Sequence, residues 1–375
     1  MAWTKKRLGD VCTIINGKNQ KDVIDINGKY PIFGSAGNVM GYANKYLCDQ
    51  GTVIIGRKGN ISTPIFIDEP FWNVDTAFGI YPKEKLMLPK FNYYQCLNID
   101  FKSRNKGTTI PSLVKTDLLT IDIYTTDSIP EQQAIVEKLD FAFDAIEKAK
   151  ANIERNIENA KELFQSKLNE IFSQKGEGNK KWVFKKLSDI FDVRDGTHDS
   201  PKYQESGFAL VTSKNLKKGK ITLDKIKFIC EKDYININKR SNVSKGDILF
   251  AMIGTIGNPV VIMEEPDFAI KNVALIKSNK ENNSYFFSYY LDLEMVIKKM
   301  QDESKGTTQR FVSLGYMRNF EVPCPKIEIQ NKIVKQIDLL SEQTNLLQEK
   351  YKQKLANLEE LKKSILEKAF KGELI

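Results

Sequence analysis

The sequence contains no apolar run of the length that crosses a membrane. A spanning helix needs about 20 consecutive apolar residues, and the charged start Met1–Arg7 lacks the apolar segment of a signal peptide. Its five cysteines are scattered over 375 residues without any Cys-x-x-Cys pair, which argues against a disulfide framework or a zinc site. These absences predict a cytoplasmic protein with reduced cysteines and no membrane attachment.

Motifs of enzymatic chemistry are missing as well. The sequence has neither a Walker loop nor the Asn- or Asp-Pro-Pro-aromatic segment of adenine methyltransferases. The triplet Asp100-Phe101-Lys102 has no Pro-Asp upstream, so the carboxylate cluster of a metal-dependent nuclease is incomplete. The single histidine, His198, cannot form a metal site or a triad alone. We therefore expect no metal and no catalytic residue in this chain.

Positive charge is in modest excess, with a formal net charge of +9. The excess of Lys and Arg over Asp and Glu lies mainly in residues 1–130 and 174–325, whereas residues 131–173 are acidic. Such a distribution is expected if the two basic blocks meet a polyanion. A surplus of this size also fits an ordinary surface, so charge alone leaves both interpretations open.

Two long stretches have apolar residues at every third or fourth position, the pattern of one helix face that packs along a partner. In the first stretch the ladder is Ile135, Leu139, Ala142, Ile146, Ala149, Ile153, Ile157, Ala160, Leu163, Lys167 and Ile171. In the second it is Ile333, Ile337, Leu340, Thr344, Leu347, Tyr351, Leu355, Leu358, Leu361, Ile365 and Ala369. The second ladder repeats the first position by position, so the two helices are predicted to be copies of one another.

Landmarks before the ladders repeat in the same order. Leu8-Gly9-Asp10-Val11 returns as Leu187-Ser188-Asp189-Ile190, and Lys106-Gly107-Thr108-Thr109 returns as Lys305-Gly306-Thr307-Thr308. Between the landmarks the copies differ, as in Tyr30–Gly37 against Gly207–Asn215. A repeated frame with different loops is typical of tandem duplication and predicts two binding sites of different specificity.

The repeat predicts five segments along the chain. They are a mixed α/β domain at 1–130 with a helix near Phe91–Leu97, a long helix at 131–173, a polar linker at 174–181, a second domain at 182–325, and a second long helix at 326–375. Asp127 or Ser128 is suited to cap the first helix, and Pro130 suits its first turn.

Several segments carry a resemblance to a known family. They are Leu8-x-Asp10-Val11, Tyr30-Pro31-Ile32-Phe33-Gly34, Val53-Ile54-Ile55-Gly56-Arg57-Lys58-Gly59, the two Lys-Gly-Thr-Thr loops, Ile129-Pro130 with Gln133, and Leu361-Lys362-Lys363-Ser364-Ile365-Leu366 with Ala369-Phe370-x-Gly372. In this order the whole chain resembles the specificity subunits of type I restriction-modification systems. It departs from the pattern at Gln309-Arg310, where the first copy has Ile110-Pro111, and at Met252-Ile253-Gly254, which lacks the Arg-Lys-Gly triplet.

The resemblance implies an α+β fold, a tandem pseudo-two-fold repeat of two mixed α/β target recognition domains separated by two long antiparallel coiled-coil helices. Each domain would read one half of a bipartite double-stranded DNA target, and the helices would set the spacer and bind two methyltransferase subunits. Restriction subunits would join in the full complex. S-adenosylmethionine, ATP and magnesium would be bound by those partners, because this chain would have no active site of its own.

Loops are expected to read the DNA. The candidate contacts of the first domain are Ser35, Arg57, Lys58, Asn60, Lys106, Thr108 and Thr109. Those of the second are His198, Lys214, Asn215, Lys217, Lys305, Thr307, Thr308, Gln309 and Arg310. Arginine and lysine bind phosphates or guanine, and hydroxyls bind phosphates or base edges.

Each candidate also has a plainer interpretation. Arg57 would equally suit a surface salt bridge, and the Lys-Gly-Thr-Thr loops would suit turns that position the next segment. The basic run Lys214–Lys220 fits a solvated charge run, and His198 fits an ordinary surface residue. The alternative for the whole chain is a two-domain coiled-coil adaptor that binds only proteins.

Overall fold

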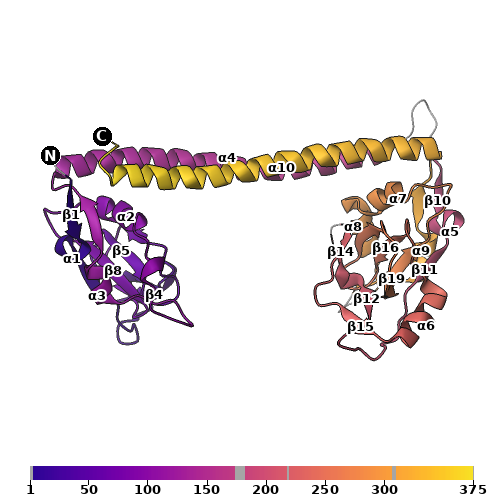
Figure 1. Ribbon diagram of the computed structural model, residues 1–375, viewed down its shortest axis with the longest axis horizontal. Coiled ribbons are helices and arrows are strands. Elements are labelled where there is room, and N and C mark those ends of the chain that lie inside the picture. The colour runs from indigo at the N-terminus through magenta and orange to yellow at the C-terminus, as the bar shows by residue number, and fades with distance from the viewer. Residues whose placement is uncertain (1–2, 174–181, 218, 306–309, 375) are drawn as a thin grey trace. The chain divides into compact units, whose positions relative to one another are not determined.

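The computed structural model describes residues 3–173, 182–217, 219–305 and 310–374. The chain divides into two compact units, one formed by residues 1–155 together with 351–375 and the other by residues 156–350. The predicted linker at 174–181 lies outside the described residues. Both units mix helices and sheets, and each includes parts of the long helices α4 (Ile129–Ser173) and α10 (Ile327–Ala369), which have 45 and 43 residues (Figure 1).

The first unit contains three small sheets with the strand orders β2-β8-β5-β6, β4-β3-β7 and β1-β9. Their strands are β1 (Thr4–Arg7), β2 (Cys12–Asn16), β3 (Tyr30–Phe33), β4 (Val39–Ala43), β5 (Thr52–Gly56), β6 (Ile65–Ile67), β7 (Trp72–Asn73), β8 (Ala77–Pro82) and β9 (Asp122–Thr125). The short helices are α1 (Leu8–Val11), α2 (Pro89–Leu97), η1 (Lys102–Arg104) and α3 (Lys115–Leu119). All strand pairs are antiparallel except β3 with β7.

The second unit repeats these orders as β11-β19-β16-β17, β15-β12-β18 and β10-β20, and adds the pair β13-β14. Its strands are β10 (Phe184–Lys186), β11 (Val193–Asp195), β12 (Phe208–Thr212), β13 (Leu216–Lys217), β14 (Lys220–Ile221), β15 (Lys227–Ile229), β16 (Ile248–Ala251), β17 (Gly257–Val261), β18 (Phe268–Lys271), β19 (Val273–Ile276) and β20 (Glu321–Pro323). Its helices are α5 (Leu187–Ile190), η2 (Ser213–Asn215), α6 (Glu231–Ser241), α7 (Ser284–Leu291), α8 (Glu294–Asp302) and α9 (Leu314–Asn319). The parallel pair recurs as β12 with β18, so the predicted duplication is confirmed strand by strand.

A glycine after the first strand of each four-stranded sheet permits the close approach of another strand end. A Cβ atom on Gly17 would lie 1.8 Å from the carbonyl oxygen of Val74, and one on Gly196 would lie 2.4 Å from that of Ile270. Any side chain at either position would displace the backbone. These two glycines therefore hold the same packing in both units.

The start of each long helix is held by a buried glutamine. In α4, Gln132 is fully buried; its Oε1 accepts from the amide of Leu88 at 2.8 Å, and its Nε2 donates to the carbonyls of Leu86 and Thr126. Gln330 of α10 takes the same place, accepting from an amide at 2.8 Å and donating to the carbonyl of Pro325. Each side chain satisfies buried backbone groups that would otherwise be unpaired.

Three aromatic rings connect the end of α10 to the first unit, and three equivalent rings connect the end of α4 to the second unit. In the first unit Phe370 lies 5.2 Å from Phe91 and 6.5 Å from Trp3 between ring centroids. In the second unit the three rings are Phe172, Phe286 and Trp182, with centroid distances of 5.3 and 6.4 Å from Phe172. We call each set an aromatic triad; the two triads occupy equivalent positions of the repeat.

Within the first unit the two helices run antiparallel. Lys150 forms an ion pair with Glu359, and Lys362, further along α10, pairs with Glu147 at 2.9 Å. The Lys362 ammonium also lies 4.8 Å from the ring centroid of Phe143. The order of these contacts confirms the antiparallel pairing for this unit. No described helix combines the length and apolarity required to cross a membrane.

The predicted ladder is not buried along its whole length. Leu361 and its equivalent Leu163 are both exposed, although the spacing assigned them to the packed seam. A ladder of 43 or 45 residues drifts around a straight helix, because 3.6 residues per turn do not match the repeat of the apolar positions. The seam is therefore interrupted at this equivalent point of both helices.

We expect Gln132→Leu to destabilise the first unit, because the substitution leaves three backbone groups without a partner at a cost of about 3 kcal/mol. Thermal unfolding followed by circular dichroism would show a lowered melting temperature for this variant. The neighbouring Gln133→Leu is the matched control, since Gln133 is exposed and its amide donates to the exposed side chain of Glu137. Equal melting temperatures for both variants would refute this role of Gln132.

Candidate nucleic-acid interface

In the first unit several strands end at one edge. β5 and β2 are antiparallel to β8 and end beside its first residues, Ala77 and Phe78. β7 ends just before β8 begins, and β3 runs parallel to β7 and ends beside Asn73. The loops that follow β2, β3 and β5 therefore emerge together, and we call this surface the strand-end edge.

Arg57 and Lys58 lie on this edge, directly after β5. Their backbone amides donate to the carbonyl of Thr76 at 2.8 and 3.1 Å, which fixes the turn. Both side chains are exposed, and within the described residues neither forms an ion pair. The guanidinium lies 5.8 Å from the ring centroid of Phe78. The salt-bridge interpretation of Arg57 thus has no partner among those residues, and both cations face solvent.

The turn after β5 is hydrogen bonded to the Lys-Gly-Thr-Thr loop. The amide of Gly59 donates to the carbonyl of Pro111, and the amide of Leu113 donates to the carbonyl of Arg57, each at 2.9 Å. Gly59 has a φ of 82°, the left-handed region that favours glycine. The structure therefore brings together two segments that the sequence proposed separately.

The Lys-Gly-Thr-Thr loop is closed on itself. Asn105 Oδ1 accepts from the amides of Gly107 and Ser112 at 2.8 and 2.9 Å. A Cβ atom on Gly107 would lie 1.9 Å from the carbonyl oxygen of Ile110, so this glycine is needed for the turn. Thr108 and Thr109 are exposed at its tip. The loop is a rigid turn, as the plainer interpretation holds, and it also presents two hydroxyls.

The other candidates of the first unit lie nearby with partners of their own. The ammonium of Lys106 is 3.5 Å from the carboxylate of Asp117, a solvent-exposed pair of small energetic value. Asn60 accepts a hydrogen bond from Thr63 at 3.0 Å. Ser35 is half-buried in the turn after β3.

The second unit forms the same edge with different side chains. The amide of Gly254 donates to the carbonyl of Arg310, and the amide of Val312 donates to the carbonyl of Met252, both at 3.0 Å. These bonds are equivalent to those of the first unit. Met252 is buried where the first unit has an exposed Arg57, and Arg310 is exposed at the place of Pro111. Lys305 begins this loop, while Thr307, Thr308 and Gln309 lie outside the described residues.

His198 lies on this edge after β11. Its Nε2 is 2.9 Å from Asp195 Oδ2 and its Nδ1 is 2.8 Å from Asn272 Oδ1. Arg240 pairs with the other oxygen of Asp195, whose side chain is only 4% exposed. A buried carboxylate between two cationic or hydrogen-bonding groups orients both of them. His198 is thus held at a defined place while its ring remains exposed.

Asn272 was not singled out in the sequence, yet it connects the loops of this edge. It lies between β18 and β19 with a φ of 55°. Its amide donates to the carbonyl of Thr197 at 3.1 Å, and its carbonyl accepts from Ser213 Oγ at 3.0 Å. The available signal was its residue type, since asparagine is enriched at positive φ, but many asparagines occur in the sequence.

The basic run after β12 contains both exposed and buried side chains. Lys214 and Lys217 are exposed, the first on η2 and the second on β13. Asn215 is 5% exposed; its Oδ1 accepts from the amide of Thr212 and its Nδ2 donates to the carbonyl of Thr222 at 3.0 Å. The Asn215 side chain therefore holds its own loop, whereas the two lysines are exposed to solvent.

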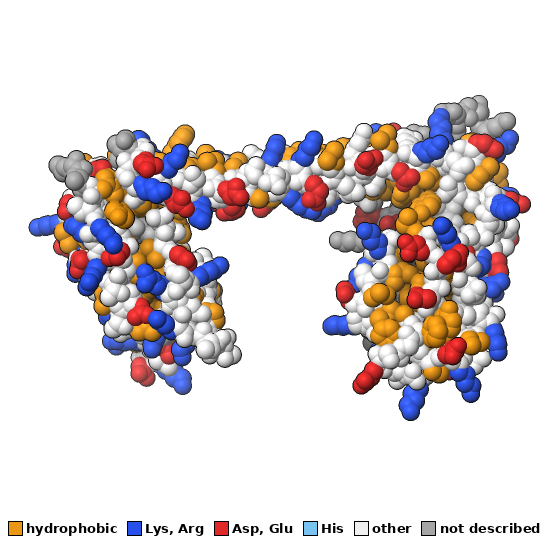
Figure 2. Space-filling view, viewed as in Figure 1, with side chains coloured by type: hydrophobic (Ala, Val, Ile, Leu, Met, Phe, Trp, Pro, Cys, Tyr) orange, Lys and Arg blue, Asp and Glu red, His pale blue; other side chains and the backbone are white. Residues whose placement is uncertain are grey.

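Charged side chains of both signs are distributed over the units. On the face shown in Figure 2, blue and red side chains are mixed and no single-sign patch covers the surface. A nucleic-acid contact on this face would thus depend on particular loops more than on a broad basic patch. The strand-end edge meets this requirement, because it gathers most of the candidate loops.

Comparison with known proteins gives the family. The model of the type I restriction modification DNA specificity domain matches residues 2–158 and again residues 179–357. The chain belongs to this family. Its two matches coincide with the two copies of the repeat, so this chain carries two copies of the specificity domain.

Relatives of the specificity-domain family cover nearly the whole chain. The type I restriction enzyme EcoBI specificity subunit of Escherichia coli is 22% identical over all of this chain and 86% of its own length. The HsdS subunit from Thermoanaerobacter tengcongensis is 18% identical over 99% of this chain and 97% of that one, with a TM-score of 0.62. Another match is a chain from a solved structure that describes complex assembly of the type I R-M system. It is 17% identical over 99% of this chain and 98% of its own length, with a TM-score of 0.75. The last two show a shared fold.

We expect Arg57→Ala to weaken binding to duplex DNA by about 1–3 kcal/mol, because an exposed guanidinium without a carboxylate partner is available for guanine or phosphate. Fluorescence anisotropy at several salt concentrations would measure the change. Arg155→Ala on α4 removes the same charge from an exposed position and serves as control. Equal affinities of both variants would exclude Arg57 as a contact.

Proposed function

We propose that each unit reads one half of a bipartite double-stranded DNA target through its strand-end edge. The observation that supports this best is the paired loops of both units, which share the same backbone hydrogen bonds and differ in the side chains they present. A fixed backbone with exchangeable side chains suits a reader of sequence, because base contacts depend on side-chain identity while phosphate contacts fix register. Membership in the specificity-domain family supports the same role.

The chemistry of the two edges differs, so the two half-sites are proposed to differ as well. The first unit presents Arg57 and Lys58 after β5, and these cations suit guanine edges and phosphates. The second unit presents His198, Lys214 and Arg310, and its turn after β16 has the buried Met252 in place of an exposed arginine. We assign the remaining exposed candidates, Lys106 and Lys217 among them, to phosphate contacts.

The long helices are proposed to bind the catalytic partners. Phe141 on α4 is 79% exposed, and Leu339, its equivalent on α10, is 56% exposed. Large apolar side chains at equivalent exposed positions suit two copies of one protein partner. We propose that two methyltransferase subunits dock here and on exposed side chains near the end of α10, such as Glu360 and Lys363, with restriction subunits joining the full complex. Cofactors for methyl transfer and cleavage would reside on those subunits, and this chain would direct them without catalysing.

The length of the helices is proposed to set the spacer between the half-sites. Each helix is continuous through 45 or 43 residues, so inserted turns would be transmitted along it. If both units bind one face of the same duplex, the half-sites are expected to lie about one DNA turn apart, or somewhat more.

Exchange of residues 182–325 with those of a family member of different specificity tests the domain assignment. We expect one half of the methylated sequence to change and the other half to remain, because each unit presents its own loops. Methylome sequencing of cells that carry the chimera with its methyltransferase reads both halves. A chain reassembled at the same junctions with its own segment is the control. Retention of the full original target by the chimera would contradict the proposal. Methylation without any sequence preference would favour the protein-only adaptor.

Insertion of seven residues, about two helical turns, within 151–165 tests the spacer. We expect the tolerated distance between half-sites to lengthen, again by methylome sequencing. The same insertion within 174–181, outside both long helices, is the matched control and should leave the spacer unchanged. An unaltered spacer in the first variant would reject the role of the helix.

A further inference from the structure

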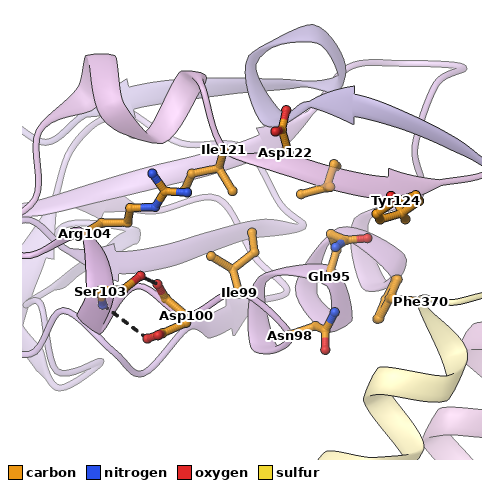
Figure 3. A pocket seen from close by; sticks show the side chains of 11 residues that line it. Gln95, Asn98, Ile99, Asp100, Ser103, Arg104, Ile121, Asp122, Tyr124 and Phe370 are labelled. Atoms are coloured by element: carbon orange, nitrogen blue, oxygen red, sulfur yellow. Dashed lines mark hydrogen bonds between the residues drawn. The ribbon is translucent and has the colours of Figure 1, made fainter.

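A pocket of about 220 Å³ opens in the first unit between the end of α2, η1, β9 and Phe370 (Figure 3). Gln95 lines it and is only 2% exposed, yet its Oε1 has no hydrogen-bond partner among the described residues. In Figure 3 the Gln95 side chain lies between Ile99 and Phe370. A buried amide oxygen without a partner is unfavourable, which points to a ligand that completes its bonding.

The second unit shows what this position accommodates. The equivalent of Gln95 is Tyr290, whose ring lies 5.6 Å from Phe172 between centroids. Tyr290 thus adds a fourth ring to the second aromatic triad. In the first unit the triad of Phe370, Phe91 and Trp3 has Gln95 in place of that ring. The Tyr290 hydroxyl is protonated at neutral pH, as that of an ordinary tyrosine is, and burial raises its pKa further, to about 12.

We propose that the pocket receives a tyrosine or tryptophan side chain of the methyltransferase subunit, which supplies the fourth ring and donates its O–H or N–H to Gln95. This inference rests on the proposed function of the helices. Phe370, one wall of the pocket, directly follows α10, and none of the candidate DNA contacts lines the pocket. A protein ring therefore fits the position better than a base of the DNA.

The surroundings of the pocket match an interface anchor. Ile99, Ile121 and Ile123 provide apolar walls, while the exposed residues Asn98, Asp100, Arg104 and Tyr124 surround them. A buried aromatic anchor within a polar rim is the usual arrangement of the residues that dominate binding energy. Because the second unit fills this position with its own tyrosine, the two methyltransferase subunits are expected to bind with unequal affinity.

A first experiment probes the pocket with p-cresol, the side chain of tyrosine, on the full chain. We expect p-cresol to shift backbone NMR signals of residues around Gln95, and the shifts to disappear in Gln95→Tyr, which fills the pocket as Tyr290 does. The control Gln50→Tyr places the same ring at an exposed loop position and should leave p-cresol binding intact. Absence of binding to the unmodified chain, or equal binding to Gln95→Tyr, would overturn the pocket assignment.

A second experiment measures assembly with the purified methyltransferase subunit by native mass spectrometry and titration calorimetry. We expect Gln95→Tyr to weaken one of the two binding events at least tenfold, with a melting temperature no lower than that of the unmodified chain. Gln95→Ala keeps the space of the pocket and removes the amide, so we expect it to weaken the same binding event by a smaller factor. It tests the pocket independently if Gln95→Tyr misfolds.

The outcomes separate this inference from the proposed function. Failure of the unmodified chain to bind the methyltransferase subunit would refute the proposed function itself. Normal assembly of the unmodified chain together with unweakened assembly of both Gln95 variants would refute only the pocket's role.

Discussion

Each domain depends on the burial of one glutamine amide at the start of a long helix. A helix of more than 40 residues needs a fixed origin, because an error in its start would shift every later contact. Gln132 and Gln330 provide this origin by bonding backbone groups of the segments before α2 and α7, and bonds to buried backbone groups tolerate little displacement. Tyr94 and Tyr289 add a matched bond each, to Asp140 and Asp338 of the helices.

The two copies keep backbone geometry and vary side chains. The bonds between the turns after β5 and β16 and their companion loops involve main-chain atoms, so they remain when Arg57 is replaced by Met252 or Pro111 by Arg310. Main-chain bonding makes the position of the loops independent of the residues that would contact DNA. A protein built in this way can change what it recognises without a change of fold.

Residue patterns predicted the architecture, but they did not predict several hydrogen bonds inside the units. Apolar periodicity located both helices, and the helix near Phe91–Leu97 is confirmed as α2. The ladder spacing could also have predicted that Gln132 is buried, because it lies three positions before the buried Ile135 and hence on the same face of the helix. The adjacent Gln133, which belongs to the family pattern, is exposed. Asn272 and the Gln95 pocket were missed because their roles arise from segments far apart in the sequence.

The division of the long helices between the units also bears on the order of folding during synthesis. Residues 156–350 of the second unit are contiguous, whereas the core of the first unit includes Leu366, Ala369 and Phe370 near the end of the chain. Chains fold progressively as they emerge from the ribosome. The unit translated first thus completes its core last, and until then its apolar surface stays open while the second unit can already close.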